Sequence, residues 1–301
     1  MNKDQAEELR LKFQQNSHTK LVNKEESLIH SPRTIAVVSG KGGVGKSNIS
    51  LSFAISLCLE GKKVLLFDMD LGMGNLDILM GRSSDYSIID FFDGKVTLEE
   101  IIYDGPNGLK YIAGGSGLNH LVGLDEWNVS IFLNELSTVI SNYDYIIFDM
   151  GAGVTKESLK FILSVQDIIV VTTPEPTSIT DAYAMMKHIH LVDSTIPFHL
   201  IVNRVQDEKE GFNTFSRLER VLTNFLHRNA FFLGAIPDDR NLQQAVRKQT
   251  PFILHNEKSA AAKALLKIRD SFAHNERENK TSGSRKQTPF IAKLKQFLFD
   301  R

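Results

Sequence analysis

The sequence predicts an α/β fold, with a mostly parallel, doubly wound sheet that carries helices on both faces. From Thr34 to about Ala273, strand-like runs alternate with helical patterns. Most of these runs are continuously apolar, which is typical of strands covered by helices on both sides. A glycine-rich turn also follows the first run and opens a helical pattern, as happens where a parallel strand leads into a helix.

The expected elements follow one another in a regular order. The predicted strands are 34–39, 63–68, 109–114, 144–149, 167–173, 198–205 and 231–237. The helical patterns between them include 46–60, 178–190, 213–227, 239–247 and 257–273. Outside this domain of residues 34–273, we expect a short helix and linker over 1–33, a flexible polar linker over 274–288 and an amphipathic helix over 289–301.

The composition is that of a soluble globular protein. The 301 residues are 42% hydrophobic and 24% charged, and the net charge of −1 provides no basic field, so we expect no nucleic-acid partner. Cys58 is the only cysteine, which excludes an internal disulfide and a cysteine-based zinc site. The polar N-terminus lacks a secretion signal, and no apolar run is long enough to span a membrane, so we expect a cytoplasmic location.

The glycine-rich stretch "GKGGVGKS" has the pattern of a phosphate-binding loop, G-x-x-x-x-G-K-[ST]. Its glycines allow backbone N–H groups to approach phosphate oxygens, and the following helix points its positive dipole end at them. We expect Lys46 to reach the β- and γ-phosphates and Ser47 to bind Mg²⁺. The predicted nucleotide contacts here are Gly40, Lys41, Gly42, Gly43, Val44, Gly45, Lys46, Ser47 and Asn48.

Carboxylates end two of the predicted strands. Asp149 ends the strand 144–149, the usual position of an acid that holds Mg²⁺ through water. Asp68 is the last residue of the predicted strand 63–68, and Asp70 follows shortly after it. Because the two acids are two residues apart, they lie on the same side of an extended chain. Ligands gather at the carboxyl ends of parallel strands, so we predict a Mg²⁺ site from Ser47, Asp68 and Asp149. The alternative is that these acids cap helices.

The stretches "KGGVGKS", "FDMDLGMGNLD" and "DMGAG" together resemble the deviant Walker A ATPases of the MinD/ParA class, in the SIMIBI group of P-loop NTPases. The resemblance covers about residues 34–273 and implies Mg²⁺-dependent hydrolysis of ATP to ADP and phosphate. It implies that Lys41 is the signature lysine, which crosses an ATP-bound homodimer to the partner's phosphates and acts there as a cation supplied in trans. It further implies that Asp70 positions or activates the attacking water.

Three later stretches resemble the same class. "VNRV" implies that Asn203 and Arg204 lie on the adenine side, and "GAIPDD" implies that Pro237 and Asp238 belong to a loop over the base. "TTPEPTSITDAYAM" implies that Glu175 lies near the nucleotide or the dimer interface, together with Thr177. A turn proline and a capping acid are the alternative for the "GAIPDD" stretch.

The C-terminal stretch "TPFIAKLKQFLFDR" has one apolar helical face with lysines on or beside the other. It is too short to span a membrane and fits a helix at the membrane surface, like the membrane-targeting helix of MinD. The alternative, a helix that packs on its own domain, is what we expect in the ADP or free form. The apolar face consists of Phe290, Ile291, Leu294, Phe297 and Leu298. ATP would then control both dimerisation and reversible residence at the inner face of the cell membrane.

The N-terminal stretch "DQAEELR" resembles the DQAxxLR motif of the FlhG family (also called YlxH or FleN), MinD-like ATPases that govern flagellar number. In that family the segment forms a helix that stimulates the FlhF GTPase. The resemblance implies that Gln5 is presented to the partner's active site and that Leu9 packs on its surface, with Asp4 and Arg10 completing the motif. Flagellar C-ring proteins are further implied partners.

Four alternatives remain beside this hypothesis. A MinD-type division-site regulator lacks the N-terminal extension, and a ParA-type DNA-partitioning ATPase needs a basic surface that the net charge does not indicate. A metal-cluster protein needs bridging cysteines, whereas Cys58 lies within the helix after the loop. A non-enzymatic scaffold would lack water-positioning acids such as Asp70.

Overall fold

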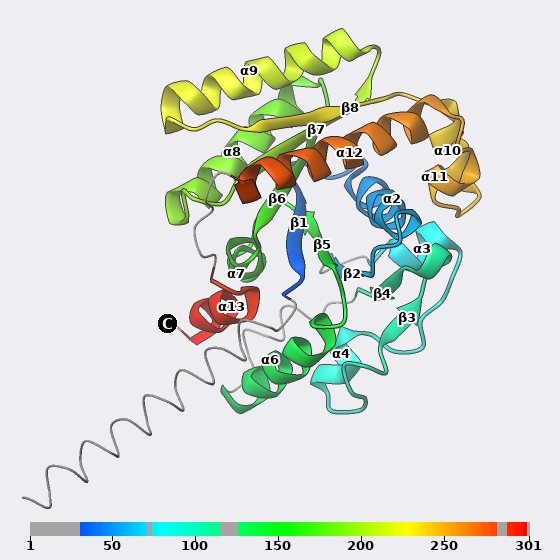
Figure 1. The fold of residues 1–301 in the computed structure, drawn as a ribbon, viewed down its shortest axis with the longest axis vertical. Coiled ribbons are helices and arrows are strands. Elements are labelled where there is room, and N and C mark those ends of the chain that lie inside the picture. Colours follow the sequence, from blue (N-terminus) through cyan, green and yellow to red (C-terminus); the bar gives the residue numbers. More distant parts are fainter. Residues whose placement is uncertain (1–30, 71–73, 115–125, 282–287, 300–301) are drawn as a thin grey trace, which may run out of the picture. The chain divides into compact units, whose positions relative to one another are not determined.

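An eight-stranded sheet runs through the structure, a computed structural model that describes residues 31–70, 74–114, 126–281 and 288–299 (Figure 1). The strand order is β3-β4-β2-β5-β1-β6-β7-β8, and every neighbouring pair is parallel except β3 and β4. The strands are β1 (Arg33–Ser39), β2 (Val64–Met69), β3 (Ile102–Asp104), β4 (Lys110–Ile112), β5 (Tyr145–Ala152), β6 (Asp167–Thr172), β7 (Phe198–Val205) and β8 (Phe231–Pro237).

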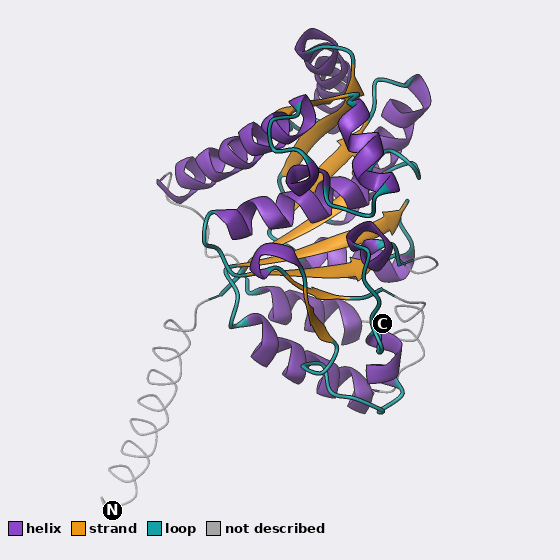
Figure 2. Cartoon of the chain, turned by 90° about the vertical axis from the view of Figure 1, so that its right-hand side faces the viewer, coloured by secondary structure: helices purple, strands orange, loops and turns teal. Residues whose placement is uncertain are grey.

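Helices cover both faces of the sheet, as Figure 2 shows. One face carries α4 (Ile88–Phe92), α6 (Glu126–Ile140), α7 (Lys156–Ser164), α8 (Pro176–Val192), α9 (Glu208–Leu226) and α13 (Phe290–Phe299). The other carries α2 (Lys46–Leu59), α3 (Leu76–Met80), α10 (Arg240–Arg247), α11 (Phe252–His255) and α12 (Ala260–Thr281). A short 3₁₀ helix, η1 (Pro106–Gly108), precedes β4.

The continuously apolar strands have two buried faces because successive side chains point to opposite sides. In β1, Ala36 and Val38 pack in the core on the α7 side, while Ile35 and Val37 pack in the core on the α2 side. All four are at most 1% exposed. The predicted α/β fold class is therefore confirmed.

Three differences from the sequence prediction concern individual elements. The strand β3 was not predicted: it has three residues and pairs antiparallel with β4 at the sheet edge. The helices α6 and α7 also lie between predicted strands without having been identified. α12 continues to Thr281, so the linker predicted over 274–288 starts later than expected. The reason is that the sequence of α12 contains no proline or glycine that would end the helix earlier.

A buried ionic network joins the first residues of three strands at the edge opposite the glycine-rich loop. Arg33 of β1 donates two hydrogen bonds to Asp167 of β6, of 2.7 and 2.9 Å, and His199 Nε2 of β7 lies 3.0 Å from the same carboxylate. Burial would raise the pKa of Asp167, but the bonds to His199 and Arg33 outweigh it and hold this pKa below its usual value. The network aligns β1, β6 and β7.

The C-terminal helix α13 packs on the domain between α6 and α7 (Figure 1). Phe290 and Leu294 are buried, and the Phe290 ring stacks on Phe148 of β5 with centroids 5.2 Å apart. Lys293 forms an ion pair of 3.6 Å with Asp193 at the end of α8. Ile291, Phe297 and Leu298 are half-buried against the same core. The apolar face predicted for a membrane thus contacts the domain in this structure.

Candidate functional site

The loop from Gly40 to Gly45 joins β1 to α2 and depends on glycine at two close approaches. A Cβ on Gly40 would lie 2.2 Å from the carbonyl carbon of Asp181 in α8. Gly45 caps α2 with φ of 93° and would place a Cβ 2.4 Å from Asn203 Nδ2. Side chains are therefore excluded where the backbone must turn, and the N–H groups at the start of α2 remain directed into the loop.

Lys46, the first residue of α2, forms a buried ion pair with Asp149 of β5. The Nζ–Oδ1 distance is 2.7 Å, and the two side chains are 7% and 1% exposed. Ser50 Oγ donates to the same oxygen at 2.8 Å, and Lys46 Nζ lies 3.3 Å from Ser47 Oγ. The loop lysine, the loop hydroxyl and the acid at the strand end are thus gathered at one point, as the sequence predicted.

The oxygens around Lys46 have the chemistry that Mg²⁺ prefers. Asp149 Oδ2 is buried and has no hydrogen-bond partner among the described residues. Asp149 Oδ1 and Ser47 Oγ both lie within 3.3 Å of Lys46 Nζ. In the part of the chain that the structure describes, no group of three or more His, Cys, Asp or Glu side chains could hold a metal by itself. Mg²⁺ commonly binds through one or two protein ligands together with substrate phosphates and water, and Ser47 and Asp149 are oxygen ligands of that kind.

Asp68 lies next to Asp149, because the register of β2 and β5 pairs these two residues. Its carboxylate accepts backbone hydrogen bonds from Asp70, Asn75 and Leu76, with lengths of 3.1, 2.9 and 3.3 Å. Burial first, and the charge of Asp149 second, raise the pKa of Asp68 to about 6. Two of these bonds come from the N–H groups at the start of α3, so Asp68 caps this helix, the alternative that the sequence left open for these acids.

Asp70, the predicted water-positioning acid, follows β2 directly. It lies near β5: a Cβ added to Gly151 would be 3.7 Å from Asp70 Oδ1. Residues 71–73 lie outside the described residues. The three predicted acids are therefore close together at the carboxyl edge of the sheet.

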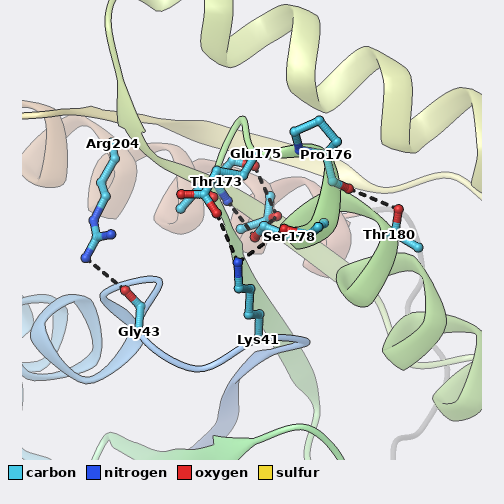
Figure 3. Close-up of polar contacts among 10 residues, drawn as sticks. Lys41, Gly43, Thr173, Glu175, Pro176, Ser178, Thr180 and Arg204 are labelled. Atoms are coloured by element: carbon cyan, nitrogen blue, oxygen red, sulfur yellow. Dashed lines mark hydrogen bonds and ion pairs between the residues drawn. The ribbon is translucent and has the colours of Figure 1, made fainter.

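Lys41 points toward the start of α8 (Figure 3). Its Nζ lies 3.1 Å from Glu175 Oε2 and 3.2 Å from Thr177 Oγ1 of the same chain. The side chains of Lys41 and Glu175 are 42% and 58% exposed. The two lysines of the loop thus have different surroundings, one buried and one at the surface.

The residues predicted on the adenine side line one pocket of about 480 Å³. Asn203 donates to the Val44 carbonyl at 2.7 Å, and Arg204 donates to the Gly43 carbonyl at 2.8 Å (Figure 3). Pro237 and Asp238 form the opposite wall, after β8. The sequence missed the further lining residues Asp239, Leu242, Gln243, Val246 and Arg247, although a helix starting at a carboxyl strand end was a signal for them.

The predicted GTPase-activating residues, Asp4, Gln5, Leu9 and Arg10, lie outside the described residues. Among the described helices, none is long and apolar enough to cross a membrane.

Comparison with known proteins identifies relatives of this chain. Residues 35–252 match the CobQ/CobB/MinD/ParA nucleotide binding domain. The antiactivator FleN of Pseudomonas aeruginosa is 33% identical over 226 residues, which are 75% of this chain and 81% of FleN. The flagellum site-determining protein YlxH of Helicobacter pylori is 40% identical over 219 residues, 71% of this chain and 73% of YlxH.

Solved structures share the fold. The MinC:MinD cell division complex of Aquifex aeolicus gives a TM-score of 0.65 at 25% identity and covers 80% of this chain and 96% of that one. MinD of Pyrococcus horikoshii, solved with Mg-ADP, gives 0.64 at 24% identity, with coverage of 84% and 98%.

The raised pKa of Asp68 predicts a particular dependence of stability on pH. The folded value of about 6 lies above the ordinary 3.8, so the folded chain holds the proton more tightly than the unfolded chain. The contribution of Asp68 to stability is complete below pH 4 and is lost as the pH rises through 6. In urea unfolding without nucleotide or Mg²⁺, the stability of the wild type relative to Asp68→Asn should fall by roughly 2–3 kcal/mol between pH 4 and 7. A difference that stays constant with pH would contradict the assignment.

Proposed function

Because the chain belongs to the CobQ/CobB/MinD/ParA family and, within it, to the FlhG (YlxH/FleN) group of MinD-like ATPases, we propose that it is a Mg²⁺-dependent, nucleotide-switched dimer that regulates flagellar number and placement. The observation that carries the proposal is the junction of Lys46, Ser47 and Asp149 at the start of α2. The flagellar role rests on the similarity to FleN, an antiactivator, and to YlxH, a flagellum site-determining protein.

The site supports hydrolysis of ATP to ADP and phosphate by positioning and electrostatics. The loop N–H groups and Lys46 bind the β- and γ-phosphates, and Lys46 exchanges its contact with Asp149 for one with phosphate. Ser47, Asp149 and Asp68 would hold Mg²⁺, the acids through water, and the ion would supply charge neutralisation at the phosphates. Asp70 orients the water that attacks the γ-phosphorus, and Asn203, Arg204, Pro237 and Asp238 enclose the base.

Lys41 completes the site of a second copy. Its contact with Glu175 joins two largely exposed side chains, and such a surface ion pair contributes at most about 1 kcal/mol. Phosphate charge on a partner chain therefore competes well for the Lys41 ammonium group. This ties hydrolysis to an ATP-bound homodimer, since the added cation stabilises the charge that develops during phosphoryl transfer.

Membrane association uses the apolar face of α13. Phe290 and Leu294, buried against the domain, each contribute roughly 1.5–3 kcal/mol to docking. Burial in lipid offers a similar gain, so the docked and inserted states are close in free energy. Two helices on one dimer bind a membrane much more strongly than one, because the second inserts at high effective concentration.

The N-terminal stretch Asp4–Arg10 is proposed to stimulate the FlhF GTPase, and flagellar C-ring proteins are proposed as further partners. Support comes from the motif and from the FleN and YlxH relatives. A MinD-type division-site regulator is the second candidate, favoured by MinD of Neisseria meningitidis at 30% identity over 241 residues. The N-terminal motif and the higher identity to YlxH favour the flagellar function.

Two substitutions test the chemistry. Lys41→Ala should lower ATP turnover by about 10³-fold or more, because the cation supplied in trans is lost. Asp70→Ala should lower ATP turnover by about 10²–10⁴-fold, because the attacking water is no longer positioned. Phosphate release measures turnover, and light scattering with a non-hydrolysable ATP analogue measures dimerisation, which Asp70→Ala should retain. Lys62→Ala, in the turn after α2, is the control. An Asp70→Ala chain that is monomeric yet fully active contradicts the role of Asp70.

Removal of residues 289–301 should abolish ATP-dependent sedimentation with anionic liposomes and leave nucleotide binding intact. Leu298→Asp, at a half-buried position of α13, should have the same effect without removing the buried Phe290 and Leu294. Unchanged sedimentation of both variants would disprove the membrane role.

Gln5→Ala should reduce stimulation of FlhF GTP hydrolysis by about 10²-fold or more, as expected when a water-orienting group is lost. The ATPase rate of this chain should not change, and Gln15→Ala provides a control within the same N-terminal stretch. Equal stimulation of FlhF by Gln5→Ala would disprove the activator role.

A further inference from the structure

A groove of about 680 Å³ follows β8, away from the Lys46 site. β8 ends the strand order, so its outer edge has no neighbouring strand among the described residues. α9 packs on one face of the sheet and α12 on the other, and Figure 1 shows β8 between these two helices. The groove thus runs along an open strand edge, with a helix as each wall.

The strand itself does little to prevent pairing at this edge. Edge strands usually carry charged side chains, or prolines, that keep other strands away. The sequence of β8, FFLGAIP, has no charged residue, and its only proline is the last residue. The outward N–H and C=O groups of β8 are therefore accessible to an extended segment that lies in the groove.

Small residues let both flanking helices approach the middle of β8 closely. A Cβ on Gly234 would lie 2.8 Å from Ile268 of α12, and one on Gly211 of α9 would lie 2.4 Å from the Ala235 Cβ. Both helices therefore lie close against the strand, while Gly234 and Ala235 present almost no side chain. A glycine inside a strand often marks the close approach of another backbone. Register shifts between Phe232 and Gly234 and between Ile236 and Pro237 leave Gly234–Ile236 as the regular part of the strand.

The groove has an aromatic anchor point. Phe212 of α9 lines it and is 56% exposed, although it packs on Phe232 with ring centroids 6.1 Å apart. Phe232 in turn stacks on the buried Phe215 at 4.9 Å. The rings form a fixed apolar wall, which suits a large apolar side chain of a bound segment.

The charges around the groove select an acidic segment. Lys209, Lys263 and Lys267 line it together with Asp207 and Glu208. The Asp207 carboxylate is committed to capping α9 through the Glu210 N–H at 2.7 Å, and Glu208 pairs loosely with Lys267 at 3.6 Å. Two lysines, Lys209 and Lys263, thus remain for acidic side chains.

A second copy of the chain fits this edge poorly. Two-fold antiparallel pairing of β8 with β8 would place α12 beside α12, so that Lys263 and Lys267 faced the same lysines of the other copy. We therefore propose that the groove along β8 binds an extended segment of another protein, in which apolar residues alternate with acidic ones, by addition of a strand to the sheet. This goes beyond the proposed ATPase function.

The test uses the full chain and labelled peptides of about nine residues, the length of a long strand. One set alternates valine, isoleucine or phenylalanine with glutamate or aspartate, and a matched set carries lysine in place of the acids. Fluorescence anisotropy should show binding of acidic peptides at least about tenfold tighter than that of lysine peptides. Amide hydrogen exchange in Gly234–Ile236 should slow when an acidic peptide is bound.

Matched variants locate the peptide. Lys263→Glu should weaken binding of acidic peptides by about tenfold and improve binding of lysine peptides, and Phe212→Ala should weaken both sets. Lys62→Glu makes the same charge change in the turn after α2 and should have no effect. ATP hydrolysis by all three variants should stay at the wild-type rate, so a failure here is distinct from a failure of the proposed ATPase.

Several results would overturn the proposal. These are no binding of the acidic set, binding that Lys263→Glu and Phe212→Ala leave unchanged, or an acidic peptide that becomes helical when bound. Self-association of the chain that Lys263→Glu alters and that acidic peptides do not displace would instead identify a second copy as the occupant.

Discussion

The rest of the site depends on the contact between Lys46 and Asp149. Both groups are almost completely removed from water, and the free-energy cost of burying two charges is recovered only when they meet at close range and are hydrogen-bonded further, as by Ser50. The contact fixes the first turn of α2 against the middle of the sheet. It also leaves one oxygen of Asp149 without a partner among the described residues, so this pair has unused capacity for a cation. A site of this kind is organised before its ligand arrives, and the protein bears the cost in stability.

The strand β5 connects this site to the C-terminal helix. Asp149 belongs to the carboxyl edge, and its neighbour Phe148 points to the opposite side of the strand, where Phe290 stacks on it. One pair of adjacent residues thus contacts both the loop lysine and α13. Because cores are closely packed, a shift of β5 at the acid would be felt at the helix. Such a short path is a physical basis for the proposed coupling of nucleotide state to release of α13.

Much of this arrangement was predictable from the sequence, for identifiable reasons. Continuous apolar runs indicate strands that are buried on both faces, so the fold class could be predicted. The loop pattern identifies Lys46 and Ser47, so the predicted phosphate-binding part of the site could also be located. The three-residue β3 carries too little pattern to be recognised. The hydrogen bonds of Asp68 come from residues two, seven and eight positions further on, and the pattern left helix capping and Mg²⁺ binding as alternatives. The pairing of Lys41 with Glu175 joins residues distant in the chain, whose geometry exists only after folding. The α10 side chains in the pocket beside Asn203 carry no motif of their own, and they meet that residue only in the folded chain. These side chains are Leu242, Gln243, Val246 and Arg247.

Pro237 lies in the walls of two cavities, the pocket beside Asn203 and the groove along β8. Its ring fixes the backbone φ, so a shift of Pro237 that changes the wall of one cavity also changes the wall of the other. By thermodynamic linkage, an occupant of one cavity that prefers a particular position of Pro237 alters the affinity of the other cavity, and the effect is equal in the two directions. Through a single imino acid at the end of an edge strand, the affinity for a protein segment would then depend on the bound nucleotide, and the affinity for the nucleotide would depend on the bound segment.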